Sequence, residues 1–97
     1  MLRVKIDKVF GPGVKISRGN YSKVKGCTIE NCKVGIHVVS AQPSILFNKI
    51  RQNLENGVFC EAKKEIRCDA LLQFNTIEKN NLNGVLLTGI NNFSKLD

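Results

Sequence analysis

The sequence FNKIRQNLENGV at residues 47–58 returns 27 residues later as FNTIEKNNLNGV at residues 74–85. Seven of the twelve aligned positions are identical, which gives the common pattern F-N-x-I-x-x-N-x-x-N-G-V. A match of this length in a chain of 97 residues indicates an internal repeat, and the period of a repeat restricts the folds that have to be considered.

Two weaker copies of the pattern lie upstream. Residues 27–36, CTIENCKVGI, fit it with one residue deleted between the isoleucine and the glycine, and Ile6 precedes Gly13 by seven residues as Ile50 precedes Gly57. The chain therefore consists of four imperfect repeats of about 22 residues, with glycines spaced by 22, 22 and 27 residues. The repeated glycines are Gly13, Gly35, Gly57 and Gly84, and the matching isoleucines are Ile6, Ile29, Ile50 and Ile77.

Each repeat contains short segments of alternating apolar residues that are separated by Asn and Gly. No segment has the sustained 3.6-residue periodicity of an amphipathic helix, and Asn and Gly favour turns over helix interiors. The Leu-x-x-Leu-x-Leu pattern of leucine-rich repeats is missing. The sequence predicts an all-β fold, a short right-handed parallel β-helix (a solenoid) of about four coils, in which each strand pairs with its equivalent one coil away at about 4.8 Å.

A chain of this length provides one domain, and we expect a single parallel β-helix segment over residues 1–97. The longer last spacing predicts a loop insertion at residues 61–69. Solenoid ends expose unpaired strands and need caps, and neither end of the sequence has the pattern of a capping helix. We therefore expect a fragment of a longer solenoid, or ends that stack on a partner. The expected coils lie near residues 1–19, 20–41, 42–68 and 69–92.

Stacked coils align equivalent residues into ladders. The position after the repeated isoleucine should face outward, with Arg51 between the acids Glu30 and Glu78, an arrangement that favours cross-strand pairing. The apolar positions one and three residues after the repeated glycine should face inward. These inward ladders are Val14, Ile36, Val58, Val85 and Ile16, Val38, Cys60, Leu87.

The asparagines of the repeat should also stack, Asn48 on Asn75 and Asn53 on Asn80, with their side-chain amides bonded along the solenoid. Cysteines replace them in the second coil, which predicts small buried residues there. Zinc ligands are commonly paired two to four residues apart, and this chain has no such pair and one histidine. We expect four free thiols and no metal or cofactor. The cysteines are Cys27, Cys32, Cys60 and Cys68.

Fifteen Lys and Arg against eight acids give a net charge of +7. The basic residues are dispersed, and the densest group is Lys63, Lys64 and Arg67, so we do not expect nucleic-acid binding, although an anionic polymer stays as an alternative ligand. The N-terminus lacks the apolar stretch of a secretory signal, and no apolar run reaches the roughly 18 residues of a membrane span. An intracellular, cytoplasmic location without membrane contact is expected.

The stretch PSILFNKIRQNLENGVFC at residues 43–60 resembles the parallel β-helix repeat of the type P-x-I-x-x-N-x-I-x-x-N-x-x-x-G-[IV]-x-[VIL]. Similar repeats occur in F-box substrate receptors, in SHC-binding spindle proteins and in bacterial periplasmic β-helix proteins of copper-enzyme maturation. The resemblance covers roughly residues 1–90 and implies the architecture. It also extends to polysaccharide lyases and hydrolases, so it leaves the function open.

Carbohydrate-active enzymes with this architecture need clustered acids, and acids are scarce here. Glu30 and Glu78 share a face two coils apart, about 9–10 Å, which suits an inverting pair of carboxylates. The intervening Arg51 is better explained by ladder pairing, and His37 has no evident partner that would make it a base. We expect no catalysis, with a carbohydrate-binding or carbohydrate-processing β-helix as the alternative.

The expected binding residues lie on the ladder two residues after the repeated glycine and in the 61–69 loop. The ladder reads Lys15, His37, Phe59 and Leu86, and Phe59 beside Leu86 would form an exposed apolar strip, of the kind that marks partner surfaces, unless a neighbouring segment covers them. In the loop, Lys63, Lys64 and Arg67 would contact a partner, unless the insertion is merely tolerated. The predicted function is a non-catalytic scaffold for protein recognition or assembly, whose partner is another protein or further coils, through the solenoid ends.

Overall fold

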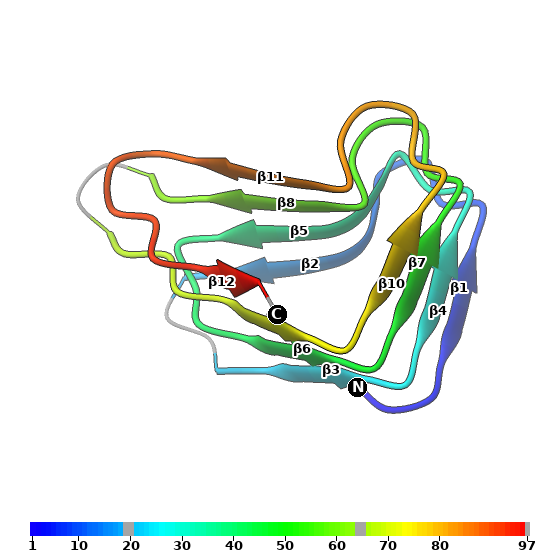
Figure 1. Cartoon of the computed structure of the whole chain (residues 1–97), viewed down its shortest axis with the longest axis horizontal. Helices are drawn as coiled ribbons and strands as arrows, with labels where there is room; N and C mark the ends of the chain where they lie inside the picture. The colour runs from blue at the N-terminus through cyan, green and yellow to red at the C-terminus, as the bar shows by residue number, and fades with distance from the viewer. Residues whose placement is uncertain (19–20, 64–65, 97) are drawn as a thin grey trace.

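The computed structural model describes residues 1–18, 21–63 and 66–96, which contain no helix. These residues form three parallel sheets of four strands each (Figure 1). The β1 sheet holds β1 (Lys5–Asp7), β4 (Thr28–Glu30), β7 (Lys49–Arg51) and β10 (Thr76–Glu78). The β2 sheet holds β2 (Pro12–Ser17), β5 (Val34–Val39), β8 (Val58–Glu61) and β11 (Val85–Thr88). The β3 sheet holds β3 (Lys23–Lys25), β6 (Ser44–Leu46), β9 (Leu71–Gln73) and β12 (Lys95–Leu96).

Every strand pairs with the equivalent strand of the neighbouring coil, which confirms the predicted all-β parallel solenoid. The repeated isoleucines stand opposite one another along the β1 sheet, from Ile6 to Ile77. The two inward ladders after the glycine also have the predicted register in the β2 sheet. Register follows the sequence because a slip of one residue would turn every buried side chain outward.

Single residues in the left-handed conformation turn the chain between sheets. Between the β3 and β1 sheets these residues are Arg3, Gly26, Phe47 and Phe74, with φ of 50°, 67°, 56° and 57°. Between the β1 and β2 sheets they are Lys8, Asn31, Gln52 and Lys79, with φ of 59°, 57°, 56° and 56°. The Asn and Gly residues that separate the strands lie in the connecting loops as predicted, but of these eight left-handed positions only two are Gly or Asn.

The repeated glycines have a different role, because none of them has a positive φ. A Cβ on Gly35 would lie 2.3 Å from the carbonyl oxygen of Gly57 and 2.6 Å from Cγ2 of Ile50. Neighbouring coils therefore approach one another too closely at this position for any side chain.

The core contains the inward isoleucines and valines together with all four cysteines, which are buried and free as predicted. Both expected asparagine ladders form, with Asn48 Nδ2 donating to Asn75 Oδ1 at 3.0 Å and Asn53 Nδ2 to Asn80 Oδ1 at 2.8 Å. Where cysteine replaces asparagine, the backbone N–H of Cys27 donates to Asn48 Oδ1 at 2.8 Å. Within the described ranges, no buried side-chain N or O lacks a hydrogen-bond partner.

Burial decreases toward the last coil. Leu87 is 38% exposed, although Val38 and Cys60 of the same inward ladder are fully buried. Its neighbour Val85 is half-buried. The β11 strand therefore presents part of the apolar core at this end of the solenoid. Across the described residues, the structure has no helix with the length and apolarity that a membrane crossing requires.

Candidate functional site

The predicted ladder of binding residues forms on the outer face of the β2 sheet. Lys15 stands opposite His37, His37 opposite Phe59, and Phe59 opposite Leu86. Lys15 is exposed, whereas His37, Phe59 and Leu86 are half-buried. One residue from each of four consecutive strands thus contributes to a single strip, although the residues are 22 to 27 positions apart in the chain.

His37 is held by two neighbours on this strip. Its ring stacks on Phe59 with centroids 4.9 Å apart and an interplanar angle of 0°. Its Nε2 lies 2.6 Å from Oε2 of Glu61, and the side chains of His37 and Glu61 are only 20% and 21% exposed. The prediction that His37 has no acidic partner is therefore wrong.

The register explains this pair. Glu61 stands opposite Val39, two residues beyond the Phe59 that faces His37, so Glu61 and His37 are diagonal neighbours on one face. Diagonal neighbours in a sheet lie within reach of long side chains. The sequence contained this signal, because Glu61 follows Phe59 at a spacing of two and therefore shares its face.

The predicted binding residues of the 61–69 loop lie in different surroundings. Lys63 lies beside the strip, with Nζ 4.0 Å from Glu61 Oε1, and its backbone N–H donates to Ser40 Oγ. A hollow of about 290 Å³ separates the loop from the ends of β2 and β5; it is lined by Ser17, Arg18, Val39, Ser40, Lys63 and Ile66.

Arg67 does not join the strip. Its Nη2 lies 3.1 Å from Asp69 Oδ2, and its guanidinium lies 4.4 Å from the ring centroid of Phe93. Lys64 lies outside the described residues. Among the described loop residues, Lys63 makes an ion pair with Glu61, and Arg67 makes one with Asp69 and a cation–π contact with Phe93. Phe59 and Leu86, which were predicted to be exposed, are half-buried.

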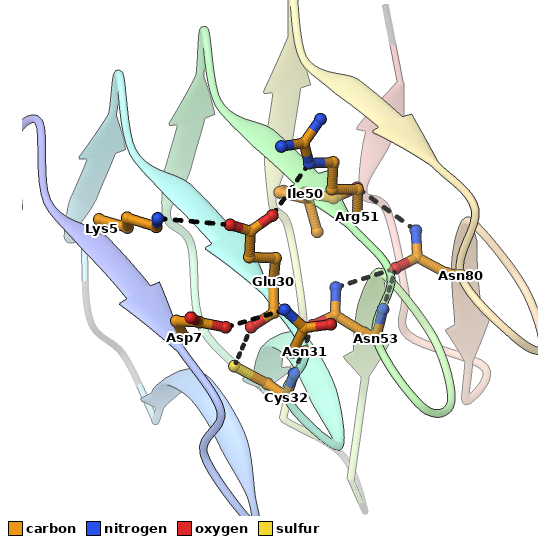
Figure 2. Close-up of polar contacts among 9 residues, drawn as sticks. All are labelled: Lys5, Asp7, Glu30, Asn31, Cys32, Ile50, Arg51, Asn53 and Asn80. Carbon is orange, nitrogen blue, oxygen red and sulfur yellow. Dashed lines mark hydrogen bonds and ion pairs between the residues drawn. The ribbon is translucent and has the colours of Figure 1, made fainter.

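A separate ladder of charged residues runs along the β1 sheet, where Asp7 stands opposite Glu30 and Glu30 opposite Arg51 (Figure 2). Glu30 was expected on the outer face, and the structure buries it there to 8% exposure between two cations. Arg51 Nε donates to Glu30 Oε2 at 3.0 Å, and Lys5 Nζ lies 3.7 Å from Oε1 (Figure 2). Arg51 pairs with one acid only, because no ion pair within 4.0 Å links it to Glu78 in the described part of the chain.

The thiol of Cys60 offers little reactivity. Burial, with a smaller contribution from nearby Cys68, raises the pKa of the Cys60 thiol to about 12. A thiol with such a pKa holds almost no thiolate at neutral pH, and the thiolate is the nucleophile and the metal ligand. In the described residues, no group of three or more His, Cys, Asp and Glu side chains could hold a metal ion.

Two exposed aromatic residues were missed as functional candidates. Phe47 and Phe74 are 55% and 67% exposed, and their rings stack with centroids 5.0 Å apart and an interplanar angle of 15°. Both belong to the repeat pattern and were used only to find it. The sequence could have indicated their exposure, since a phenylalanine that recurs at a turn between strands does not point into the core.

A comparison with protein-family models matches residues 3–95 to the model described as right-handed β-helix region. Searches of curated proteins and of solved structures gave no significant match. The matched segment covers nearly the whole chain and coincides with the three stacked sheets. The chain therefore belongs to the right-handed β-helix family.

Proposed function

We propose that this chain is a non-catalytic β-helix module that binds another protein through the outer face of the β2 sheet, in an intracellular setting. The observation that carries the proposal is the strip of His37, Phe59 and Leu86 on that face. Aromatic and apolar side chains in a row, with charged residues around them, are typical of partner surfaces.

The side chains of the strip are preorganised for binding. His37 is fixed by its stack on Phe59 and by its 2.6 Å contact with Glu61, so little side-chain entropy remains to be lost on binding. Lys15 lies at one end of the ladder and Lys63 next to Glu61, and the chain carries a net charge of +7. These features favour a partner segment with apolar side chains flanked by acidic residues.

The geometry of the acids favours a binding role over carbohydrate processing. A glycosidase needs two carboxylates that face the scissile bond. Glu30 instead faces Arg51 and Lys5, both within 4 Å, and is almost completely covered. Glu78 is exposed and stands two strands further along the same sheet.

Assembly through the end of the solenoid is part of the same proposal. Leu87 and Val85 point into the core and yet are only partly covered. A further coil, or a strand from another chain, would cover them and pair the free edge of β11.

The test compares three baits in a quantitative pull-down with chemical crosslinking: the wild type, a Phe59→Asp and Leu86→Asp double variant, and a control. The control is a Leu54→Asp and Leu82→Asp double variant, because both leucines are 63% exposed and lie outside the strip. We expect a partner that the wild type and the control retain, that crosslinks to Lys15 or Lys63, and that the Phe59 and Leu86 variant loses at least tenfold.

Two results would contradict the proposal. One is a set of bound proteins that is the same for all three baits, with folding verified by circular dichroism. The other is saturable binding of a neutral polysaccharide that Glu30→Gln or Glu78→Gln abolishes, which would instead favour the carbohydrate alternative. Light scattering on the same samples reports whether copies associate through their ends.

A further inference from the structure

The turn between the β3 and β1 sheets carries its own ladder, on a different face from the strip. Each member of this ladder comes directly after a residue that is paired with its equivalent in the next coil. These paired residues are Leu2 with Lys25, Lys25 with Leu46, and Leu46 with Gln73. Backbone hydrogen bonds continue the alignment, from Arg3 N–H to the Lys25 carbonyl at 3.0 Å and from Gly26 N–H to the Leu46 carbonyl at 3.1 Å. The ladder reads Arg3, Gly26, Phe47, Phe74.

Gly26 is not required by the backbone. It has φ of 67°, but Arg3, Phe47 and Phe74 adopt nearly the same left-handed conformation with side chains attached. A Cβ on Gly26 would meet only Cγ of Arg3, at the ordinary contact distance of 3.4 Å. The effect of glycine here is therefore to leave one position of the ladder without a side chain.

The empty position opens a slot beside a flat aromatic face. A hollow of about 460 Å³ is lined there by Leu2, Arg3, Lys25, Gly26 and Phe47. The Phe47 ring stacks on Phe74, and Phe47 also lines the hollow. The backbones of Arg3 and Phe47 lie two strand spacings apart, about 9.6 Å, and the Gly26 position between them carries no side chain.

Cations surround the slot. Lys25 Nζ lies 5.9 Å from the centroid of the Phe47 ring, and the exposed Arg3 borders the hollow on the opposite side. Lys23, on the same strand as Lys25, is also exposed. Basic residues that are dispersed in the sequence are thus gathered beside an exposed aromatic ring.

We propose that this slot binds one nucleotide of a single-stranded nucleic acid, with the base stacked on Phe47 and the phosphate contacted by Arg3 and Lys25. Aromatic platforms beside cations are the usual way in which proteins bind single strands without reading their sequence. A sugar ring suits the slot less well, because the four side chains that line it include no acceptor for the protons of sugar hydroxyls. This binding site is independent of the protein-recognition strip.

The test is an NMR titration of the ¹⁵N-labelled chain with adenosine 5′-monophosphate, alongside adenosine and ribose 5-phosphate. We expect saturable shifts of the Gly26, Phe47 and Lys25 amides with the nucleotide, and at least tenfold weaker binding of either fragment. A single-stranded 12-nucleotide oligomer should bind more tightly than the mononucleotide and lose affinity as salt rises.

Two variants and one control localise the binding. Gly26→Phe should fill the slot and extend the Phe47–Phe74 stack, so that binding falls at least tenfold, with circular dichroism verifying that the variant folds despite the strain of a side chain at φ of 67°. Phe47→Ala should remove the platform with a similar loss. Phe10→Ala is the control, because Phe10 is completely exposed and does not line the hollow.

Several results would overturn the proposal. These are full binding by Gly26→Phe, ribose 5-phosphate that binds as tightly as the nucleotide, and shifts that cluster away from Gly26. Displacement of the oligomer by an equal concentration of an oligogalacturonate would also overturn it, because the site would then recognise negative charge alone.

Discussion

At the scale of the residue, burial changes the chemistry of single side chains. Cys60 is fully buried in the core of the β2 sheet, and its pKa is raised to about 12 because the thiolate would lose its hydration there. In the unfolded chain, the pKa of this thiol has its ordinary value near 9.0. Folding is therefore linked to the protonation of Cys60.

The sign of this linkage gives a prediction. Because the folded pKa is the higher one, the folded state keeps a proton that the unfolded state loses above pH 9. The stability contributed by the protonated thiol should be fully present below pH 9 and fall as pH rises toward 12. Urea unfolding of the wild type and of Cys60→Val at pH 8 and pH 10.5 isolates this term from the titration of lysines. A stability difference between the two proteins that does not change with pH would contradict it.

His37 and Glu61 show what sequence reasoning misses at the same scale. The ladder of His37 followed from the repeat, and its outward position was predicted correctly. The 2.6 Å contact with Glu61 was not predicted, because Glu61 was assigned to the loop insertion although it ends β8. An error of one residue in the boundary of a strand thus concealed the partner.

At the scale of the element, the strands are short and are held by contacts between coils. Gly35 lies in β5, where a side chain would collide with the backbone of the next coil 2.3 Å away and with Ile50. Backbone cannot move aside as a flexible side chain can. The repeated glycine therefore keeps the coils at the spacing that the parallel ladder needs.

Gly35→Ala should accordingly destabilise the chain by about 3 kcal/mol or more, at the upper end of the cost of overpacking. Gly11→Ala is the matched control, because a Cβ there meets nothing within 4 Å. It should leave the stability within about 0.5 kcal/mol of the wild type. Chemical denaturation measures both, and equal stabilities of the two variants would refute the close-approach explanation.

At the scale of the whole molecule, a solenoid is stabilised by its own repeats and by the contacts between neighbours. Ile50 is completely buried between coils, while Ile77 at the same ladder position is only half-buried. Equivalent residues of one ladder therefore contribute unequally, according to their distance from the edge.

Ile50→Ala should cost about 2–5 kcal/mol, the usual range for deleting a buried isoleucine. Ile77→Ala should cost less than half as much, since its surroundings are already open to solvent on one side. The free energies of unfolding of the two variants compare them directly. If they are equal, something covers the last coil in solution, and light scattering would show whether a second copy does so.

The architecture, the register and the inward ladders could all be predicted from the amino-acid sequence. This was possible because each residue of a stacked repeat is packed against its own equivalent, so that Ile6, Ile29, Ile50 and Ile77 had to meet once the repeat was aligned. The asparagine ladders followed for the same reason.

Only the tertiary structure decided which non-equivalent residues meet. The diagonal contact of His37 with Glu61, the ion pair of Lys5 with Glu30, and the position of Lys25 beside the Phe47 ring all depend on neighbours outside the aligned position. Their distances depend on the angles at the turns and on side-chain conformations, which the period of a repeat does not specify. The pairing of equivalent positions follows from the repeat in the sequence, whereas contacts between non-equivalent positions form only when the coils pack against one another.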